Sequence, residues 1–401
     1  MASTITKGTP VSANSAASSN VCVAVLDETH FVIMYDDDGG DGYPHVKVGV
    51  ITGDNTITFG SEYTIASESG YPMDITALDS THFAVVYKGS DTHGHCKIGV
   101  VSNGDEVAFG SDYEFIASRI EDACIEKWTS TTFAVICWDY GTSGYAKGYV
   151  GTVANGDEIS YGSQGAIVSL ALSSMTLTKF DGEDKFLLTS KASGYCRQMV
   201  VSVSGTSISG SINNLVRNVT QESCCGVNLT GTDCIALLKT QSNNDSYLCT
   251  GTRSSTTITS RDNTVLVTSA AIAIEYMGVC RMDDTHFGLV FGNQYTLSVG
   301  QFTYNPSTYA WTEDTTATLF SQYSSAEAKT PIAPLGNGYD FVAVYRDETN
   351  SDNAYAVVAR MDDLEVFGPA NLKTFNGVAA ANVKTIDGTA IASVKSINTI
   401  V

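Results

Sequence analysis

The chain has 401 residues, of which 43% are hydrophobic and 16% are charged, and it contains 36 glycines. This balance is typical of a packed globular protein and excludes a disordered chain, while the glycine content suits many short strands joined by turns. The formal net charge is −21, which argues against nucleic acid and anionic membrane surfaces as partners, because both require a basic face.

The N-terminal residues Met1 to Lys7 lack the long apolar core of a signal peptide, and no apolar run approaches the ~18 residues of a membrane span. We therefore expect synthesis in the cytoplasm without a signal peptide, and no membrane insertion. Ten cysteines should then remain thiols. Cys96 and Cys196 share a repeat position with Val46 and Ala146, so we interpret them as small core residues.

A segment of about ten residues recurs seven times along the chain. Its clearest copies begin at Leu26, Leu78 and Met282 with an apolar residue followed by Asp-x-Thr-His-Phe, and weaker copies begin at 128, 180, 229 and 335. Successive copies are 49 to 53 residues apart. A repeat of this length indicates a single array rather than two or three ordinary domains.

Each repeat contains four segments with strand character, here called A to D. Strand B, as in residues 83–87, is apolar on both faces and should be buried on both, whereas strand C, as in residues 95–100, alternates more. Four strands in ~50 residues without helical periodicity is the pattern of a β-propeller blade, with a solenoid as the alternative. We predict an all-β fold, a seven-bladed β-propeller of four-stranded antiparallel blades over residues 1–375, followed by a short β-repeat tail over 376–401. The B strands should lie near residues 31, 83, 133, 186, 234, 287 and 341.

The closure of the ring has two solutions. Residues 3–10 repeat the D-strand pattern of residues 55–62, so the chain has eight D-like segments for seven blades. Either residues 1–12 complete the last blade, or residues 364–374 do so and the N-terminal copy is extra. The sequence does not decide between them.

The histidines follow the repeat. His30, His82 and His286 occupy one repeat position, and His45 and His95 occupy another. A residue type that recurs by blade serves the architecture, here through hydrogen bonds within the turn. No HExxH, Walker or GxSxG motif is present. We therefore assign no catalytic residues and expect that the protein is not an enzyme.

The loops between strands B and C vary most among the repeats. In a propeller these loops emerge on one face, and the first of them carries Asp36, Asp38 and Asp41 among glycines. Because hard cations prefer several carboxylates on a flexible loop, we predict a weak calcium site there. The alternative is a solvated acidic turn. No other cofactor is indicated.

Aromatic residues begin strand C beside the B–C loops in most repeats. Stacking aromatics with nearby Asp and Asn are typical of sugar-binding surfaces, and packing between blades is the alternative. We name as candidate ligand-binding residues Tyr145, Tyr195, Tyr247, Tyr295 and Tyr355.

The tail has a different pattern. Lys373, Lys384 and Lys395 recur every 11 residues, and Asn376-Gly377 and Asp387-Gly388 are strong hairpin dipeptides. Residues 1–375 resemble seven-bladed β-propellers without the Trp-Asp signature of the WD40 class. Residues 376–401 resemble the short C-terminal repeats of tailed-phage virion and tail-fibre-like proteins. That resemblance implies anchoring to other virion proteins or to a second copy through the tail, and display on the virion surface. The apolar residues we expect to bury in such an assembly are Ile386, Ile391, Val394 and Ile397.

The sequence therefore favours a virion structural or appendage protein that displays a propeller for binding a receptor or cell-surface glycan. A free, lectin-like carbohydrate-binding propeller is the alternative, in which the tail would be irrelevant. A propeller hydrolase or lyase is less favoured, because no pair of carboxylates stands out against the repeat.

Overall fold

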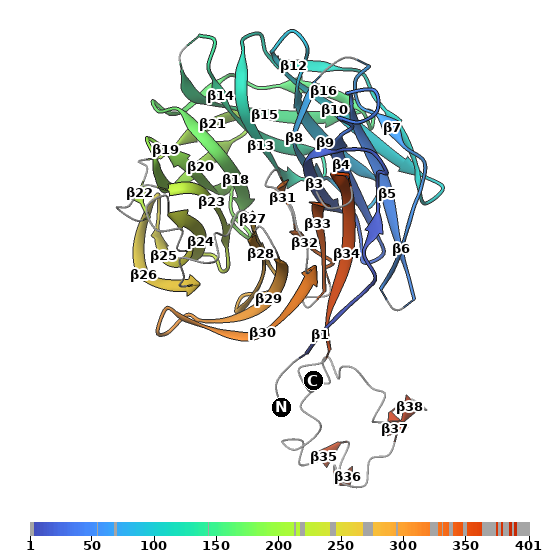
Figure 1. Ribbon diagram of the computed structural model, residues 1–401. Helices are drawn as coiled ribbons and strands as arrows, with labels where there is room; N and C mark the ends of the chain where they lie inside the picture. The colour runs from blue at the N-terminus through green and yellow to red at the C-terminus, as the bar shows by residue number, and fades with distance from the viewer. Residues whose placement is uncertain are drawn as a thin grey trace.

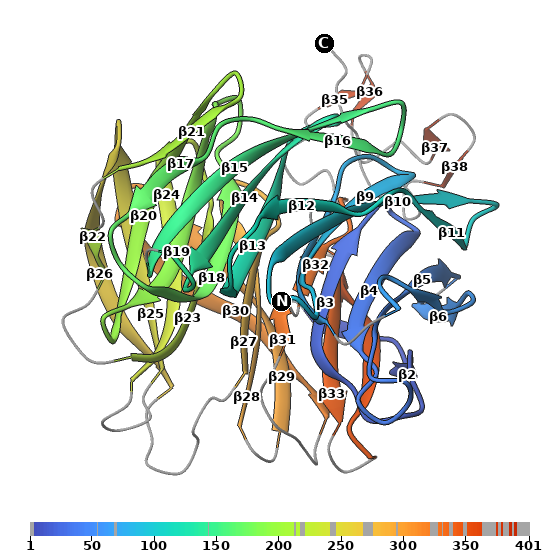
Figure 2. The same ribbon diagram turned by 90° about the horizontal axis from the view of Figure 1, so that it is seen from above.

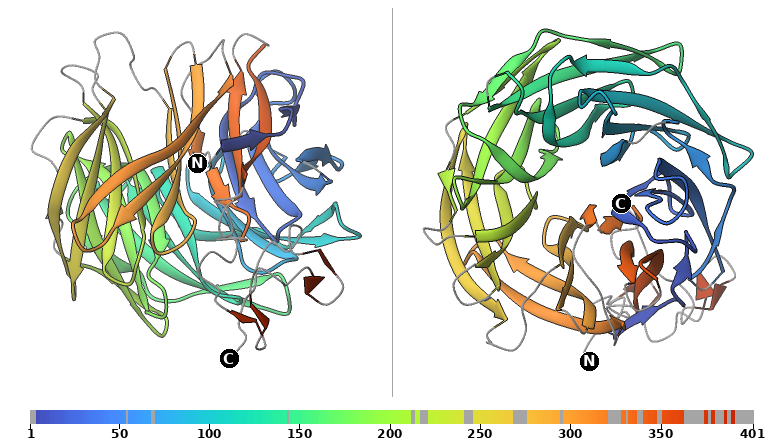
Figure 3. Two further views of the ribbon diagram at one scale, coloured as in Figure 1. Left: turned by 90° about the horizontal axis from the view of Figure 1, so that it is seen from below. Right: turned by 45° about the horizontal axis from the view of Figure 1, so that its top comes forward.

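The computed structural model describes residues 4–390, apart from 54, 68–69, 143, 212–213, 217–220, 241–245, 268–275, 294–295, 321–327, 331, 337–339, 348–350, 363–373, 376–377, 380–384 and 387–388. All regular structure in the described residues is β-strand, and none of it is a helix of the length and apolar character needed to cross a membrane. Seven sheets follow one another around a ring, so that the last lies beside the first (Figure 3, right). The chain is a seven-bladed β-propeller, as predicted.

Strand A is the innermost strand of each blade, and strands B, C and D follow it outward, as β3 to β6 illustrate (Figure 2). Polar side chains on these inner strands join neighbouring blades. Asp74 accepts a hydrogen bond from the Ile125 amide at 3.0 Å, and Thr176 accepts one from the Gly226 amide at 3.0 Å. The A strands are β3 (Ser19–Val25), β8 (Tyr71–Ala77), β13 (Ile120–Thr129), β18 (Leu172–Lys179), β23 (Gln221–Asn228), β27 (Tyr276–Arg281) and β32 (Ile332–Pro334).

Strand B is the most completely buried strand, as its continuous apolar sequence predicts. The buried positions predicted near 31, 83, 133, 186, 234, 287 and 341 all fall on it. The B strands are β4 (His30–Asp36), β9 (His82–Lys88), β14 (Thr132–Asp139), β19 (Lys185–Ala192), β24 (Asp233–Thr240), β28 (His286–Asn293) and β33 (Phe341–Asp347).

Strand C pairs with B on one side and with D on the other. The C strands are β5 (Pro44–Thr52), β10 (Gly94–Ser102), β15 (Tyr145–Ala154), β20 (Tyr195–Ser204), β25 (Ser246–Ser254), β29 (Thr296–Asn305) and β34 (Asn353–Asp362).

Strand D is short in the first four blades, where a second short strand returns to pair with C. In blades 5 and 6 strand D is a continuous strand of 11 residues with bulges. The D strands of blades 1 to 6 are β6 (Thr56–Phe59), β11 (Glu106–Phe109), β16 (Glu158–Tyr161), β21 (Ser207–Gly210), β26 (Thr257–Val267) and β30 (Ala310–Phe320). The returning strands are β7 (Tyr63–Thr64), β12 (Tyr113–Ile116), β17 (Gly165–Val168) and β22 (Asn214–Leu215).

The N-terminal segment closes the ring. β1 (Thr4–Lys7) pairs antiparallel with β34, with Ile5 opposite Met361, and β2 (Val11–Ser12) pairs with the same strand (Figure 1). The last blade therefore takes its outer strand from the start of the chain, which decides the question that the sequence left open. On the inner side, β31 (Ala328–Thr330) runs parallel to β3.

The hydrophobic core lies between neighbouring blades rather than at the centre of the ring. One cluster, for example, joins Leu78 and Val86 of blade 2 to Ile125 and Phe133 of blade 3. All ten cysteines are free and buried, in agreement with their interpretation as core residues.

The tail contains two short hairpins. β35 (Thr374–Phe375) pairs with β36 (Val378–Ala379), and β37 (Thr385–Ile386) pairs with β38 (Thr389–Ala390). The predicted turn dipeptides Asn376-Gly377 and Asp387-Gly388 stand between these paired strands in the sequence and lie outside the described residues.

Candidate functional site

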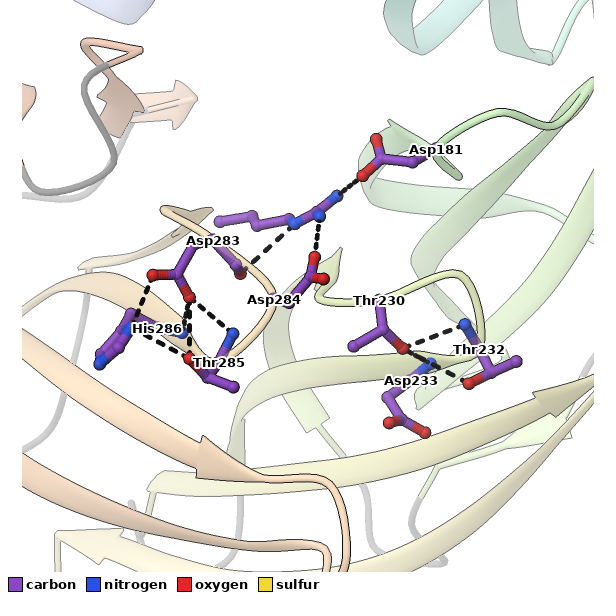
Figure 4. A network of polar contacts seen from close by, with 9 residues as sticks. Asp181, Thr230, Thr232, Asp233, Asp283, Asp284, Thr285 and His286 are labelled. Atoms are coloured by element: carbon purple, nitrogen blue, oxygen red, sulfur yellow. Dashed lines mark hydrogen bonds and ion pairs between the residues drawn. The ribbon is translucent and has the colours of Figure 1, made fainter. Parts of the chain in front are cut away.

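The turn that joins strands A and B is held by an aspartate side chain. In blade 6, Asp283 Oδ1 accepts hydrogen bonds from the amides of Thr285 at 2.6 Å and His286 at 2.7 Å, and its Oδ2 lies 2.7 Å from His286 Nδ1 (Figure 4). Asp27 and Asp79 make the same contacts in blades 1 and 2. The predicted use of these histidines in turn hydrogen bonds is therefore confirmed.

In blades 3 and 5 a threonine replaces this aspartate, and in blade 7 the position is Gly336. Thr230 Oγ1 accepts hydrogen bonds from the amides of Thr232 at 3.1 Å and Asp233 at 2.8 Å, in the same place in blade 5 (Figure 4). Turn geometry, rather than ionisation, is therefore what the repeat keeps at this position.

The seven A strands enclose a cavity of about 490 Å³, which is lined by residues from every blade. Glu126 lines it from β13. Burial raises the pKa of the Glu126 carboxyl to about 8, and the charge of Asp74 adds to this effect while Lys127 and Lys179 oppose it. At the A–B end of the cavity, Arg281 pairs with Asp181 of blade 4 and with Asp284 (Figure 4). The Arg281–Asp181 ion pair thus joins blades 6 and 4 at this opening.

The opposite face, formed by the B–C loops and the D–A connections, is called the B–C face. Of the tyrosines predicted to bind ligand there, Tyr145 is exposed, Tyr195 is half-buried, and Tyr247 is buried. Tyr355 stacks on Tyr345 with ring centroids 5.7 Å apart. Tyr295 lies outside the described residues. Tyr355 therefore packs within its blade, Tyr247 packs in the core between blades 4 and 5, and Tyr145 is the most exposed of the predicted tyrosines that the structure describes.

The exposed large apolar side chains of the described residues gather on the B–C face of blades 2 and 3. They are Tyr71, Tyr140 and Tyr145, which are 56%, 52% and 46% exposed. Tyr71 begins β8, and the loop between β14 and β15 carries Tyr140 and ends at Tyr145. Together with Trp138 we call these residues the aromatic platform.

Charged side chains connect the two halves of the platform. Lys88 Nζ lies 4.9 Å from the ring centre of Tyr71 and 3.4 Å from Glu121 Oε2. Glu121 also pairs with Arg119, whose guanidinium carbon lies 4.9 Å from the ring centre of Tyr140. Three charged side chains of alternating sign thus link the Tyr71 ring of blade 2 to the Tyr140 ring of blade 3.

Trp138 supports the blade 3 half of the platform. Its ring packs edge-on against Tyr140 at 5.5 Å, and its Nε1 donates a hydrogen bond to the Gly144 carbonyl at 3.2 Å. Asp139 accepts a hydrogen bond from Ser118 Oγ at 2.5 Å. These hydrogen bonds hold both ends of the blade 3 loop.

Tyr71, Trp138 and Tyr140 were not predicted from the sequence as site residues. A usable signal was their departure from the repeat, since Trp138 stands where blades 1 and 2 have Asp36 and Lys88. Searching for positions that recur selects architecture, whereas a binding site on one side of a ring must break the repeat.

Blades 1 and 2 each hold a cluster of histidine and carboxylate groups on the B–C face. In blade 1, ligand atoms of Asp37, Asp41 and His45 lie within 4.8 Å of one another, and His45 Nε2 is 2.8 Å from Asp41 Oδ1. This set shares only Asp41 with the predicted calcium ligands. Asp38 is exposed and is not part of the cluster.

Asp36, the remaining predicted ligand, is buried and is not a member of this cluster. Burial raises the pKa of its carboxyl to about 7, and the neighbouring charges of Asp38, Asp37 and Asp41 add to this effect. Calcium binding through Asp36, Asp38 and Asp41 stays a prediction, and the geometry offers Asp37 and His45 as the nearer partners of Asp41. Among the predicted assembly residues, Ile386 lies in β37, and Ile391, Val394 and Ile397 lie outside the described residues.

No protein-family model matches the chain, and no curated protein matches its sequence. Solved structures do match it. The BP39L lectin from Burkholderia pseudomallei aligns with a TM-score of 0.60 and 9% identity over 86% of this chain and 96% of that one. The β-propeller domain of Cps50 (Swd1) from Myceliophteria thermophila aligns with a TM-score of 0.56 and 8% identity over 88% of this chain and 99% of that one.

A structure described as "a putative 6-phosphogluconolactonase" from Bacteroides uniformis aligns with a TM-score of 0.53 and 11% identity over 84% of this chain and 95% of that one. At such identities the likeness shows the fold alone. It nevertheless corrects our expectation that the protein is not an enzyme, because propellers of this architecture include proteins described as enzymes. The lack of a short catalytic motif in the repeats does not exclude catalysis.

Proposed function

We propose that the propeller binds glycans at the aromatic platform on the B–C face of blades 2 and 3. The observation that carries this proposal is the clustering of Tyr71, Tyr140 and Tyr145, the large apolar side chains that remain exposed in the described part of the chain. Exposed rings that are gathered on one face, rather than scattered, mark an interaction surface.

The chemistry of the platform suits a sugar. Tyrosine and tryptophan rings offer flat apolar faces for the C–H side of a pyranose, and their polar edges form hydrogen bonds. Lys88, Glu121 and Arg119 alternate donors and acceptors between the rings, as hydroxyl groups require. Two cations beside one carboxylate also accommodate an acidic sugar in an otherwise acidic protein.

Binding to immobilised glycans, followed by calorimetry on the glycans that bind, tests this proposal. Tyr140→Ala and Tyr71→Ala should each weaken binding roughly 2- to 10-fold, since an aromatic contact contributes about 0.5–1.5 kcal/mol beyond its buried area. Tyr195→Ala is the control, because Tyr195 is a half-buried tyrosine on the same face that begins strand C of blade 4, outside the platform. Equal affinity of the platform variants and the wild type would refute the proposal.

We also propose that residues 376–401 anchor the propeller in a virion, so that the platform is displayed on its surface. The support is the resemblance of the tail to repeats of tailed-phage virion proteins, together with the two hairpins β35–β36 and β37–β38. An isolated hairpin is marginal in water and gains stability by pairing with another sheet edge.

Deleting residues 376–401 should abolish copurification with assembled particles and leave glycan binding unchanged. A deletion variant that still enters particles at the wild-type level would leave the free, lectin-like propeller as the better account. Because the two measurements are separate, loss of the anchoring proposal does not affect the glycan proposal.

A further inference from the structure

We propose that Asp91, His93, His95 and Glu114 of blade 2 form a binding site for a divalent transition-metal ion of the zinc class. Ligand atoms of Asp91, His95 and Glu114 lie within 4.8 Å of one another. His93 joins them, because its Nδ1 lies 3.0 Å from Glu114 Oε2 and 3.4 Å from Asp91 Oδ2. Two imidazoles and two carboxylates therefore converge on one point of the B–C face.

The histidine at the inner end of this group has a supporting carboxylate behind it. His95 Nδ1 lies 3.1 Å from Asp112 Oδ2, while its Nε2 lies 3.2 Å from both oxygens of Asp91. Asp112 in turn accepts a hydrogen bond from Tyr87 Oη at 2.8 Å. A carboxylate at Nδ1 favours the tautomer that carries its proton there, which leaves the Nε2 lone pair for a metal, and metal-binding histidines commonly have this arrangement.

The group is both fixed and accessible. His95 is buried against the Tyr87 ring with centroids 5.5 Å apart, and the His93 amide donates a hydrogen bond to Asp91 Oδ1 at 2.9 Å. Asp91 and Glu114 are exposed and His93 is half-buried. An ion can therefore enter from solvent and meet side chains that are already held near one another.

The donor atoms select the kind of metal. Zinc and similar first-row ions bind imidazole nitrogen together with carboxylate oxygen, whereas calcium and magnesium prefer oxygen alone. Blade 1 offers a natural comparison, because it keeps His45 and Asp41 but has Tyr43 and Thr64 where blade 2 has His93 and Glu114. The blade 1 cluster has one imidazole, so we expect the stronger site in blade 2.

Calorimetric titration of the full chain with zinc chloride, without glycan, tests the proposal. We expect saturable binding that Asp91→Asn and His93→Gln each weaken at least 10-fold, while His45→Gln in blade 1 leaves it unchanged. Asp112→Asn should weaken it about 10- to 100-fold through its effect on His95. Melting curves check that each variant keeps its fold. We expect the Asp91 and His93 variants to do so, because Asp91 is exposed and His93 is half-buried.

Cobalt supplies an independent readout. Cobalt bound at this site should give visible absorption without the thiolate charge-transfer band, because all ten cysteines are buried in the core. Absence of zinc binding to the wild type, affinity that is unchanged in folded Asp91→Asn and His93→Gln variants, or a thiolate band from cobalt would each overturn the proposal. Glycan binding is measured without metal, so either proposal can fail alone.

Discussion

At the scale of single residues, one aspartate oxygen accepts the hydrogen bonds that hold the A–B turn in blades 1, 2 and 6. Asp79 Oδ1 accepts hydrogen bonds from the amides of Thr81 and His82, both at 2.8 Å. Partial burial raises the pKa of the Asp79 carboxyl, but these hydrogen bonds and that from the His82 ring outweigh it, and the pKa is lowered to about 2. The ionised carboxylate therefore stabilises the folded turn.

Asp79→Ala should lower the free energy of unfolding by about 1 kcal/mol near neutral pH, because two turn amides lose their acceptor. The folded pKa lies below the ordinary value of 3.8, so this contribution is present above pH 3.8 and is lost as pH falls toward 2. Urea unfolding of wild type and variant across this range measures it. A cost that stays constant down to pH 2 would contradict the role of the ionised carboxylate.

The pKa of Glu126 is shifted in the opposite direction to that of Asp79. Its pKa in the folded protein is raised above the ordinary value of 4.5 to about 8, so the fold favours the protonated acid. The penalty for ionisation appears as pH rises from 4.5 and is complete above about 8. Glu126→Gln should therefore raise the melting temperature relative to wild type at pH 9 and have little effect near pH 4. An equal difference at both pH values would contradict this account of the cavity.

At the scale of elements, strands B and C fit together through a glycine opposite a phenylalanine. Gly99 pairs with Phe83, and a Cβ at Gly99 would lie 2.1 Å from the Phe83 ring. Gly49 and Phe31 of blade 1 repeat this arrangement with the same distance. The phenylalanine ring therefore occupies the space that a side chain at the glycine would need.

Gly99→Ala should therefore destabilise the protein by about 1–3 kcal/mol, the usual cost of overpacking a core. Phe83→Leu removes the ring atoms that would clash with the alanine Cβ. Gly99→Ala should therefore cost less stability in the Phe83→Leu background than in the wild type. Thermal melting of the wild type, both single variants and the double variant measures this coupling. Strictly additive effects would show that the glycine serves another purpose.

The elements were the most predictable part of the structure. The repeat placed strands A, B and C because apolar runs such as residues 83–87 are buried on both faces in every blade. The returning strand β12 and the parallel strand β31 were not predicted, since each is short and depends on a partner from elsewhere in the chain. The D strand of the last blade was ambiguous for the same reason, because pairing with β34 is a contact between the two ends of the propeller.

At the scale of the whole molecule, closure depends on β1. Its four residues pair with β34, and Ile5 packs against the core shared by blades 6 and 7. Deleting residues 1–8 should lower the melting temperature and promote aggregation, because an unpaired edge strand is exposed. Deleting residues 376–401 is the control and should leave melting unchanged. A closure-deficient chain that melts like the wild type would contradict the role of β1.

The candidate site was less predictable than the fold. Tyr145 was predicted from the sequence, but its grouping with Tyr71 and Tyr140 was not. Tyr71 lies on β8, whereas Tyr140 lies in a loop of the next blade. Lys88, Glu121 and Arg119 link the Tyr71 and Tyr140 rings, and of these contacts the Lys88–Glu121 ion pair crosses the blade boundary. Such contacts depend on how neighbouring blades pack, which a repeat pattern does not encode.

The most direct test of the glycan proposal uses the fluorescence of Trp138, which contacts Tyr140 within the platform. The chain has three tryptophans, so the Trp128→Phe, Trp311→Phe double variant reports on Trp138 alone. Titration with a glycan that binds should change this emission, with a midpoint that matches the calorimetric affinity. Emission from Trp138 that stays constant while calorimetry shows that glycan binds to the same variant would place the ligand elsewhere and contradict the account.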